Sequence, residues 1–367
     1  MRLLSAHKPV RIGRVAADRI FDAAACCGAI VILAEPLAIP LLRRMQAMDV
    51  PGLRSSHSVP TPRGGGIPIA VGLLVAAALI RGGASAAFAV AVGFFGLLGF
   101  TDDVHGLTAV RRLALQGAGS AVVAVLLITP MHLALGATVA LILAAVVWIT
   151  GFVNAFNFMD GVNGISATHA LIAGVAYACY GEWEQQRFLL AAGLAVAVSA
   201  LMFLPWNAGR ARVFLGDVGS YTLGAALAML AALAVLRGLP LEAVTGPLAL
   251  YLADTAWTLQ RRIRTGERWL QPHRSHVYQR WCDAGWSHQE VTLLTGAITI
   301  LLTGLGTASL DGDLPLRIAA DLTGMAILAA YLSSPAVFRR LGLHPDAEPQ
   351  RCDGGPQSSV PRWDPRP

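Results

Sequence analysis

Long apolar runs recur along almost the whole chain, and they limit it to very few architectures. Each run is about 15 to 25 residues long, close to the length of a helix that crosses a bilayer. The 367 residues are 55% hydrophobic and only 14% charged, and the mean hydropathy is +0.58. This composition lies outside the range of soluble domains. The sequence therefore predicts an all-α, polytopic transmembrane helical bundle.

We expect about ten or eleven spans. No small-residue cleavage site follows the first run, which is interpreted as a span and not as a removable signal. Residues 1–340 would form the membrane domain, and residues 341–367, rich in Pro, Gly and charge, a disordered cytoplasmic tail. The predicted spans are Ala23–Ile39, Ile67–Ile80, Ala84–Phe100, Leu113–Ile128, Leu133–Val153, Ile165–Tyr180, Phe188–Leu204, Tyr221–Leu236, Glu242–Gln260, Val291–Gly306 and Leu316–Leu332.

Unusual polar residues gather in every second loop, after predicted spans 1, 3, 5, 7 and 9. Because successive spans alternate in direction, these five loops should share one face of the membrane. That face carries 19 of the 28 Lys and Arg residues, although the N-terminus on the other face is also basic. The positive-inside rule then places the five loops in the cytoplasm. The pattern predicts one cytoplasmic active site built from separate loops.

The polar segment from Asn154 to Gly164 follows the fifth predicted span. Asn154, Asn157 and Asp160 recur at every third position, which places them roughly on one face of a helix. Asn163 adds another carboxamide, and the neighbouring glycines let a ligand approach the backbone. A plain turn is the alternative. A helix end with amides and an acid is typical of a site for a polar, charged substrate.

Two earlier loops carry further candidates. His57 and Arg63 could contact a phosphate or a lipid headgroup, or could belong to an ordinary interfacial loop. Asp102 and Asp103 lie at the end of the third span, where acids are costly to desolvate. Their oxygens suit a divalent cation or an acid–base role, and a solvated helix cap is the alternative.

Asp217 lies between glycines at the start of the eighth span and is a third candidate metal ligand. Phe214, three residues earlier, could stack on a base or simply pack, and packing is favoured by its chemistry alone. Arg111 and Arg112 follow the acidic pair closely enough to bind an anionic substrate.

The loop after the ninth span contains His273, Arg274 and His276. Two histidines three residues apart could bind zinc or phosphate, and phosphate is favoured because no Cys or acid stands beside them at a metal-ligand spacing. Asp254, inside the ninth span, is either a functional acid or a helix-packing contact. His169 is interpreted as a hydrogen-bonded helix contact.

These motifs, taken in order, resemble those of the polyprenyl-phosphate N-acetylhexosamine-1-phosphate transferases (glycosyltransferase family 4). The resemblance implies an inner-membrane bacterial enzyme that moves a sugar-1-phosphate from a UDP-sugar to undecaprenyl (polyprenyl) phosphate and releases UMP. Such enzymes start O-antigen, exopolysaccharide or cell-wall glycan synthesis. The matching stretches are His57–Gly66, Asp102-Asp103, Asn154–Gly164, Phe214–Gly219 and His273–Gln279.

The last motif reads Arg274-Ser275-His276, where the peptidoglycan branch of the family carries a run of histidines. It looks more like the branch that initiates O-antigen glycans. The resemblance also implies the partners and the cofactor of the protein. The partners would be polyprenyl phosphate, a UDP-sugar and the bilayer; a homodimer is allowed, and no nucleic acid is expected. Its cofactor would be Mg²⁺, with Mn²⁺ as the alternative.

By the same resemblance, Asp217, Asp102 and Asp103 correspond to the family's metal-binding and catalytic acids, and one of the pair acts on the lipid phosphate. His273 and His276 match its pyrophosphate-contacting catalytic loop. The chain departs from the family at Asn163, where an Asp is usual, and after the acidic pair, where arginine replaces a frequent lysine. The implied substrate-binding residues are His57, Arg63, Arg111, Arg112, Asn154, Asn157, Asp160, Asn163, Phe214 and Arg274, with Asn157 and Asp160 on the nucleotide side and Phe214 stacked on uracil.

Two other classes of protein share some of these features. A multi-pass transporter of a polar or anionic substrate would use Asp254 and the Gly-rich helices for a translocation path. The acids gather at one face, however, and no internal repeat is visible. A catalytically inactive scaffold of the same fold would not need Asp102, Asp103 and Asp217 together.

The orientation can be tested with single cysteines in a background without native thiols. We expect cysteines at Ser55, Ala109 and Ala208 to resist a membrane-impermeant thiol reagent in intact cells, because these positions face the cytoplasm. Cysteines at Gly82 and Gly238 should be labelled. The reverse pattern would overturn the cytoplasmic placement.

Overall fold

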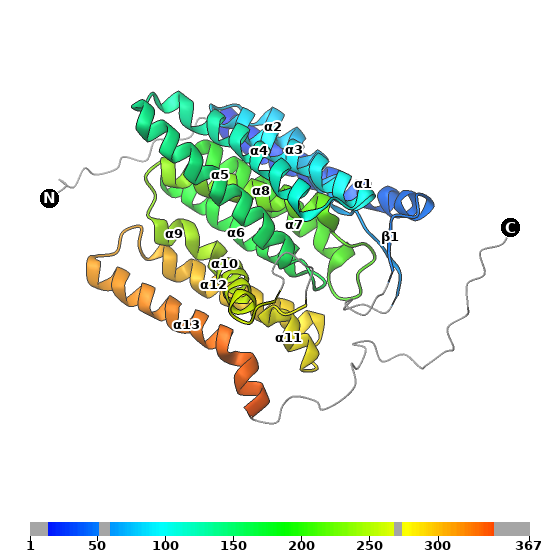
Figure 1. The fold of residues 1–367 in the computed structure, drawn as a ribbon. Helices are drawn as coiled ribbons and strands as arrows, with labels where there is room; N and C mark the ends of the chain where they lie inside the picture. Colours follow the sequence, from blue (N-terminus) through cyan, green and yellow to red (C-terminus); the bar gives the residue numbers. More distant parts are fainter. Residues whose placement is uncertain (1–13, 51–58, 268–273, 341–367) are drawn as a thin grey trace, which may run out of the picture.

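Long apolar helices lying side by side form most of the computed structural model, which describes residues 14–50, 59–267 and 274–340 (Figure 1). The helices are α1 (Arg14–Arg44), α2 (Gly66–Leu79), α3 (Ser85–His105), α4 (Ala109–Ile128), η1 (Thr129–Met131), α5 (Leu135–Phe158), α6 (Ile165–Trp183), α7 (Arg187–Asn207), α8 (Gly216–Leu236), α9 (Leu241–Thr245), η2 (Gly246–Leu248), α10 (Ala249–Arg264), α11 (Val277–Asp283), α12 (His288–Thr307) and α13 (Leu314–Arg340). Two short antiparallel strands are β1 (Met48–Asp49) and β2 (Thr61–Pro62).

Eight of the described helices are long and apolar enough to cross a membrane: α1, α3, α4, α5, α7, α8, α12 and α13. The apolar helix α2 is shorter, with 14 residues, and α6 packs along α7. The polytopic all-α fold is thereby confirmed, and every predicted span except the ninth is one helix. The proposed tail of residues 341–367 lies outside the described residues.

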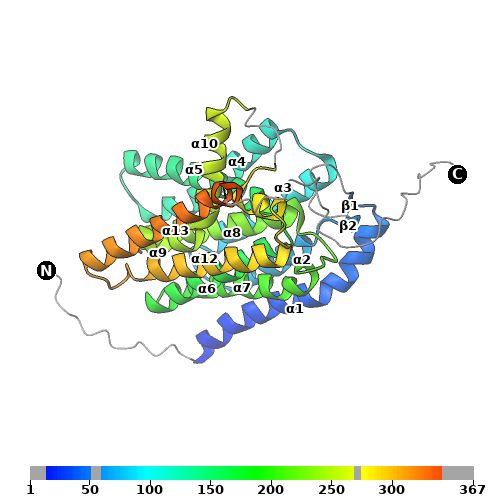
Figure 2. The ribbon, with the colours of Figure 1, turned by 90° about the horizontal axis from the view of Figure 1, so that it is seen from below.

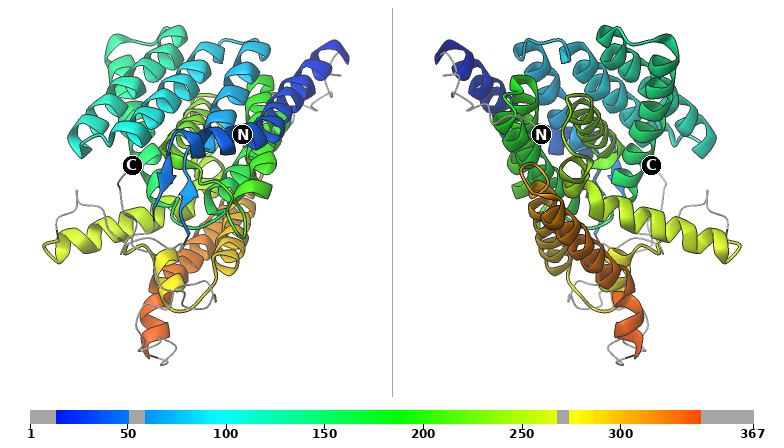
Figure 3. Two further views of the ribbon diagram at one scale, coloured as in Figure 1. Left: turned by 90° about the vertical axis from the view of Figure 1, so that its right-hand side faces the viewer. Right: turned by 90° about the vertical axis from the view of Figure 1, so that its left-hand side faces the viewer.

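The ninth predicted span, Glu242–Gln260, is wrong as a single helix. The chain instead forms α9, a 3₁₀ turn at η2 and then α10. Pro247 lies in that turn. Proline has no backbone N–H and its ring clashes with the preceding turn of an α-helix, so the helix breaks there. Figure 1 shows α10 almost end-on, and Figures 2 and 3 show that it projects from the bundle across the direction of the long helices.

The helix α8 forms the centre of the bundle. Within its most apolar window, 89% of the residues are buried, and it packs against α2, α3 and α5. A Cβ at Gly66 of α2 would lie 2.1 Å from the Cα of Gly219, and a Cβ at Gly99 of α3 would lie 2.2 Å from the carbonyl oxygen of Asp217. Glycines therefore let both neighbouring helices approach the first turns of α8 at backbone distance.

Backbone hydrogen bonds join the loop that contains Arg63 to the loop that contains Phe214. The N–H of Phe214 donates to the carbonyl of Pro62 at 2.8 Å, and the N–H groups of Gly64 and Gly65 donate to the carbonyl of Phe214 at 3.2 and 2.9 Å. These bonds place Arg63 directly beside the start of α8. The strands and this junction lie at the end of the bundle where α1 terminates (Figure 2).

One buried acid of the bundle has no partner in the described part of the chain. Glu35 lies on the buried stripe of α1, between Val31 and Ile39, and is 0% exposed. Neither carboxyl oxygen has a hydrogen bond to a described residue. Burying a polar group without a hydrogen bond costs about 1–3 kcal/mol.

We therefore expect Glu35→Leu to raise the thermal unfolding midpoint of the detergent-purified protein, because leucine has similar bulk and no polar atoms. Glu35→Gln is the control: it keeps the size and the unsatisfied polar group, and it should not raise the midpoint. A drop in the midpoint of the leucine variant would show that Glu35 has a stabilising polar contact.

Candidate active site

Asp103 holds the start of α8. Its two carboxylate oxygens each accept a backbone N–H, one from Asp217 and one from Val218, both at 2.9 Å. The first N–H groups of a helix have no partner within the helix, and a carboxylate is favourable there. Gly216, with φ +75°, makes the turn, and a Cβ on it would lie 2.7 Å from an Asp103 oxygen. Asp103 thereby fixes the position of Asp217.

Arg63 bridges the two acids. Its Nε lies 2.7 Å from Oδ1 of Asp103, and its Nη2 lies 2.9 Å from Oδ1 of Asp217. Burial disfavours the charged guanidinium, but the carboxylates of Asp217 and Asp103 more than offset this and raise the pKa of Arg63. The guanidinium therefore stays protonated and neutralises part of the acidic charge.

Asn157 supplies the fourth member of the group. Its Nδ2 donates to Oδ1 of Asp217 and to the hydroxyl of Ser220, both at 2.9 Å. Four predicted site residues from four separate loops or helix ends, Arg63, Asp103, Asn157 and Asp217, thus meet at the start of α8. We refer to these four as the carboxylate cluster.

Asp160 is close to this cluster but is not on a helix with Asn157. The helix α5 ends at Phe158, so the predicted common face of Asn154, Asn157 and Asp160 is wrong. Asp160 instead occupies the connection between α5 and α6. Desolvation, reinforced by the Asp217 carboxylate, raises the pKa of Asp160 to about 7.

The adjacent Asp102 points elsewhere, because consecutive side chains on a helix diverge. The Tyr221 hydroxyl donates to its Oδ2 at 2.6 Å, and the Leu107 N–H donates to its Oδ1 at 2.8 Å. Arg112 lies 3.7 Å from the same carboxylate. Asp102 is buried and ties the α3–α4 turn to α8.

The donors of the carboxylate cluster suit a hard cation. Within residues 14–50, 59–267 and 274–340, no three His, Cys, Asp or Glu side chains gather as a metal site by themselves. Asp103 and Asp217 do bring together carboxylate oxygens of the type that Mg²⁺ and Mn²⁺ accept, and Asn157 presents its amide nitrogen to Asp217. A positive charge already lies between the two acids, in the guanidinium of Arg63. The residues present therefore fit a divalent cation bound at Asp217.

Other predicted substrate-binding residues lie outside the carboxylate cluster. The Asn154 amide donates to Gln116 of α4 at 2.6 Å, which is a contact between helices. The Asn163 amide donates to the Gly209 carbonyl at 2.7 Å and joins two loops. Arg111 is exposed, in contrast to its neighbour Arg112. His57 and His273 lie outside the described residues.

The motif around His276 packs under the end of α5. His276 is 2% exposed, and its ring centre lies 6.2 Å from that of Phe158. The Tyr278 hydroxyl donates to the Phe158 carbonyl at 2.9 Å. Arg274 pairs with Asp283 at 3.1 Å. The segment around His276 thus reaches Phe158, the residue next to Asn157.

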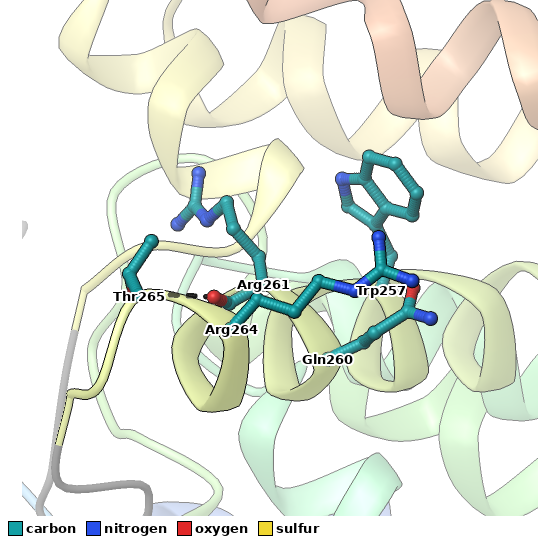
Figure 4. Close-up of a pocket in the computed structure, with 5 residues that line it drawn as sticks. All are labelled: Trp257, Gln260, Arg261, Arg264 and Thr265. Atoms are coloured by element: carbon teal, nitrogen blue, oxygen red, sulfur yellow. Dashed lines mark hydrogen bonds between the residues drawn. The ribbon is translucent and has the colours of Figure 1, made fainter.

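The basic end of α10 lines a separate pocket (Figure 4). In this view Arg261 lies at one side of the pocket near Thr265, and the guanidinium of Arg264 lies at the other side, beside Trp257 and Gln260. Arg261 also donates to the carbonyl of Ser275 at 3.1 Å, so this end of α10 holds the segment that leads into α11.

Sequence reasoning missed several partners of the site. Tyr221 lies four residues after Asp217, so the helical period could have placed it on the same side of α8. Ser220, which accepts from Asn157, directly follows the Phe214–Gly219 motif and was not predicted as a site residue. Tyr331 of α13, which donates to Asp254, gave no sequence signal because nothing in its own segment points to a partner so far away in the chain.

The structure defines a polytopic all-α membrane protein with a charged polar site at one end of its bundle. The family described as Glycosyl transferase family 4 matches residues 85–235, which run from α3 to α8 and contain three members of the carboxylate cluster. A phospho-N-acetylmuramoyl-pentapeptide-transferase of Geobacillus sp. (strain WCH70) is 30% identical over 307 residues, which cover 76% of this chain and 93% of that protein. The chain belongs to this family, as the sequence motifs predicted.

Other relatives are named as N-acetylglucosaminephosphotransferases. The decaprenyl-phosphate N-acetylglucosaminephosphotransferase of Mycobacterium leprae (strain TN) is 28% identical over 356 residues, covering 85% of this chain and 88% of that protein. The enzyme of the same name from Mycolicibacterium smegmatis is 28% identical over 351 residues, covering 83% and 85%. The similarity therefore extends well beyond the segment that matches the family.

The raised pKa of Asp160 predicts a pH dependence of stability. The pKa of Asp160 is about 7 in the folded protein and 3.8 in the unfolded chain. Between about pH 4 and 7, Asp160 therefore keeps its proton in the folded protein and loses it in the unfolded chain. The folded state then binds more protons, so stability falls as pH rises through this window and levels off above it.

We expect the thermal unfolding midpoint of the wild type in EDTA to fall between pH 4 and 7, and that of Asp160→Asn to fall less. Asp311→Asn, in the exposed turn before α13, is the matched control and should follow the wild type. Parallel curves for the wild type and the Asp160 variant would contradict the assignment.

Proposed function

We propose that the protein transfers an N-acetylhexosamine-1-phosphate from a UDP-sugar to polyprenyl phosphate. In this reaction an oxygen of the lipid phosphate attacks the phosphorus next to the sugar, the bond between the two phosphates of the nucleotide breaks, and UMP leaves. The observation that carries the proposal is the carboxylate cluster, which sits inside a chain whose relatives are named as transferases to polyprenyl phosphates. A multi-pass transporter explains this one-sided cluster less well.

Asp217, supported by Asn157 and Asp103, would hold Mg²⁺, or Mn²⁺ in its place. When bound, the cation would neutralise charge on the diphosphate. Arg63 would hold phosphate oxygens beside Asp217 through guanidinium N–H groups other than those that pair with the two acids. Asp103 has a supporting role, because its oxygens already accept two backbone N–H groups and the Nε of Arg63.

Arg112 is the candidate contact for the lipid phosphate. Arg112 is partly buried near the turn between α3 and α4, and it pairs with Asp102. Asp102 is the neighbour of Asp103 in the sequence. Besides charge neutralisation, phosphoryl transfer depends on the positioning of the two substrates, which a helical bundle provides. Placement of the polyprenyl tail along the helices explains why an enzyme that uses a soluble nucleotide sugar is built in a bilayer.

The site would face the cytoplasm of the bacterial inner membrane, where UDP-sugars are made. The arginine asymmetry of the loops supports this orientation. The Arg274-Ser275-His276 form of the last motif favours an O-antigen-type pathway over the peptidoglycan step. A donor panel of UDP-N-acetylglucosamine, its galactose epimer and UDP-6-deoxy amino sugars, read out by lipid-dependent UMP release, tests both the reaction and the donor.

Replacing Asp217 by Asn should lower UMP release to background while the variant remains folded in the membrane, because the change removes the charge that holds the cation. EDTA should have the same effect on the wild type, and added Mg²⁺ should reverse it. Asp311→Asn, the same chemical change far from the cluster, should keep full activity. Substantial activity of the Asp217 variant, or of the wild type in EDTA, would reject the metal assignment.

A further inference from the structure

A second buried acid, Asp254, lies outside the carboxylate cluster and is 0% exposed in α10. Four groups donate to it. The backbone N–H of Val277 lies 3.2 and 3.1 Å from its two oxygens, and the Tyr331 hydroxyl bonds Oδ2 at 2.5 Å. The Thr258 hydroxyl and the Nδ1 of His276 bond Oδ1 at 3.1 and 2.9 Å. This set satisfies a buried carboxylate.

The bond to His276 fixes which ring nitrogen can act elsewhere. Because Asp254 accepts at Nδ1, that nitrogen carries a proton, and any contact of the ring with substrate has to run through Nε2. The backbone of the same residue is also held, since its N–H donates to the Gln279 side chain at 3.2 Å. His276 therefore has a fixed place, and its Nε2 can donate to a phosphate oxygen only in the imidazolium form, in which both ring nitrogens carry a proton.

The position of the ring connects it with the proposed site. His276 packs against Phe158, the neighbour of Asn157 in sequence, and stacks on Tyr278. Tyr278 in turn bonds the Phe158 carbonyl and limits the space beside Gly161. The end of α5 that carries Asn157 to Asp217 is thus the same end that receives His276.

We propose that Asp254 is a positioning residue of the transferase, which acts through His276 and holds its imidazolium ring so that the Nε2–H donates to the diphosphate of the donor. The proposal rests on the proposed function. A helix-packing role alone would require only that Asp254 joins α10, α11 and α13. Such a packing role would not require the hydrogen bond from His276 to Asp254, because the Val277 N–H and the Tyr331 hydroxyl already join α11 and α13 to Asp254.

The test is a double-mutant cycle on kcat/KM for lipid-dependent UMP release, using Asp254→Asn and His276→Ala singly and together. We expect His276→Ala to lower kcat/KM about 30- to 1,000-fold, as for loss of one hydrogen-bond donor to a developing phosphate charge. Asp254→Asn should lower it about 10- to 100-fold, as is typical when a partner that orients a histidine is removed. In the His276→Ala background the same change should cost less than about threefold.

Additive effects in the cycle would overturn the proposal, because they would show that Asp254 acts independently of His276. Tyr331→Phe is the matched control: it also removes one hydrogen bond from Asp254, and it should lower the unfolding midpoint while changing kcat/KM by less than about threefold. If Asp254→Asn does not fold, Asp254→Glu, which keeps the carboxylate, replaces it in the cycle. Absence of UMP release by the wild type would instead reject the proposed function.

Discussion

The contact on which the site depends is the capping of α8 by Asp103. A single carboxylate of α3 accepts the first N–H groups of α8, and Arg63 of another loop closes on the same carboxylate. The geometry of Asp217 therefore follows from backbone hydrogen bonds, and its charge is balanced by a guanidinium. The buried end of a membrane helix would otherwise leave N–H groups unsatisfied, and here those groups fix the position of the Asp217 carboxylate through Asp103.

Close packing makes that contact possible. Because Gly66 and Gly99 bring α2 and α3 to backbone distance from the start of α8, Asp103 and Arg63 can reach it with short, directed bonds. The pairing of Phe214 with the Arg63 segment adds a further constraint. Loops that are far apart in the sequence are thus held rigidly, which is what phosphoryl transfer by positioning demands.

Most of the spans and four residues of the site could be predicted from the sequence. Apolar run length predicts spans, because a bilayer imposes it, and alternation of spans predicts which loops meet. Arg63, Asp103, Asn157 and Asp217 were accordingly expected at one site. The pattern could not show that Asp102 and Asp103 point to different partners, or that Asn154 faces Gln116, since these depend on where helices end and how they rotate.

The one wrong span is the most instructive. Run length alone joined α9 to α10, whereas Pro247 breaks the helix and turns α10 out of the bundle (Figure 3). In a straight span Asp254 would be an isolated acid among apolar helices, which is costly. In the broken one it meets the N–H of Val277, the ring of His276 and the hydroxyl of Tyr331. The break therefore gives a buried acid its partners and brings the histidine motif back to the end of α5.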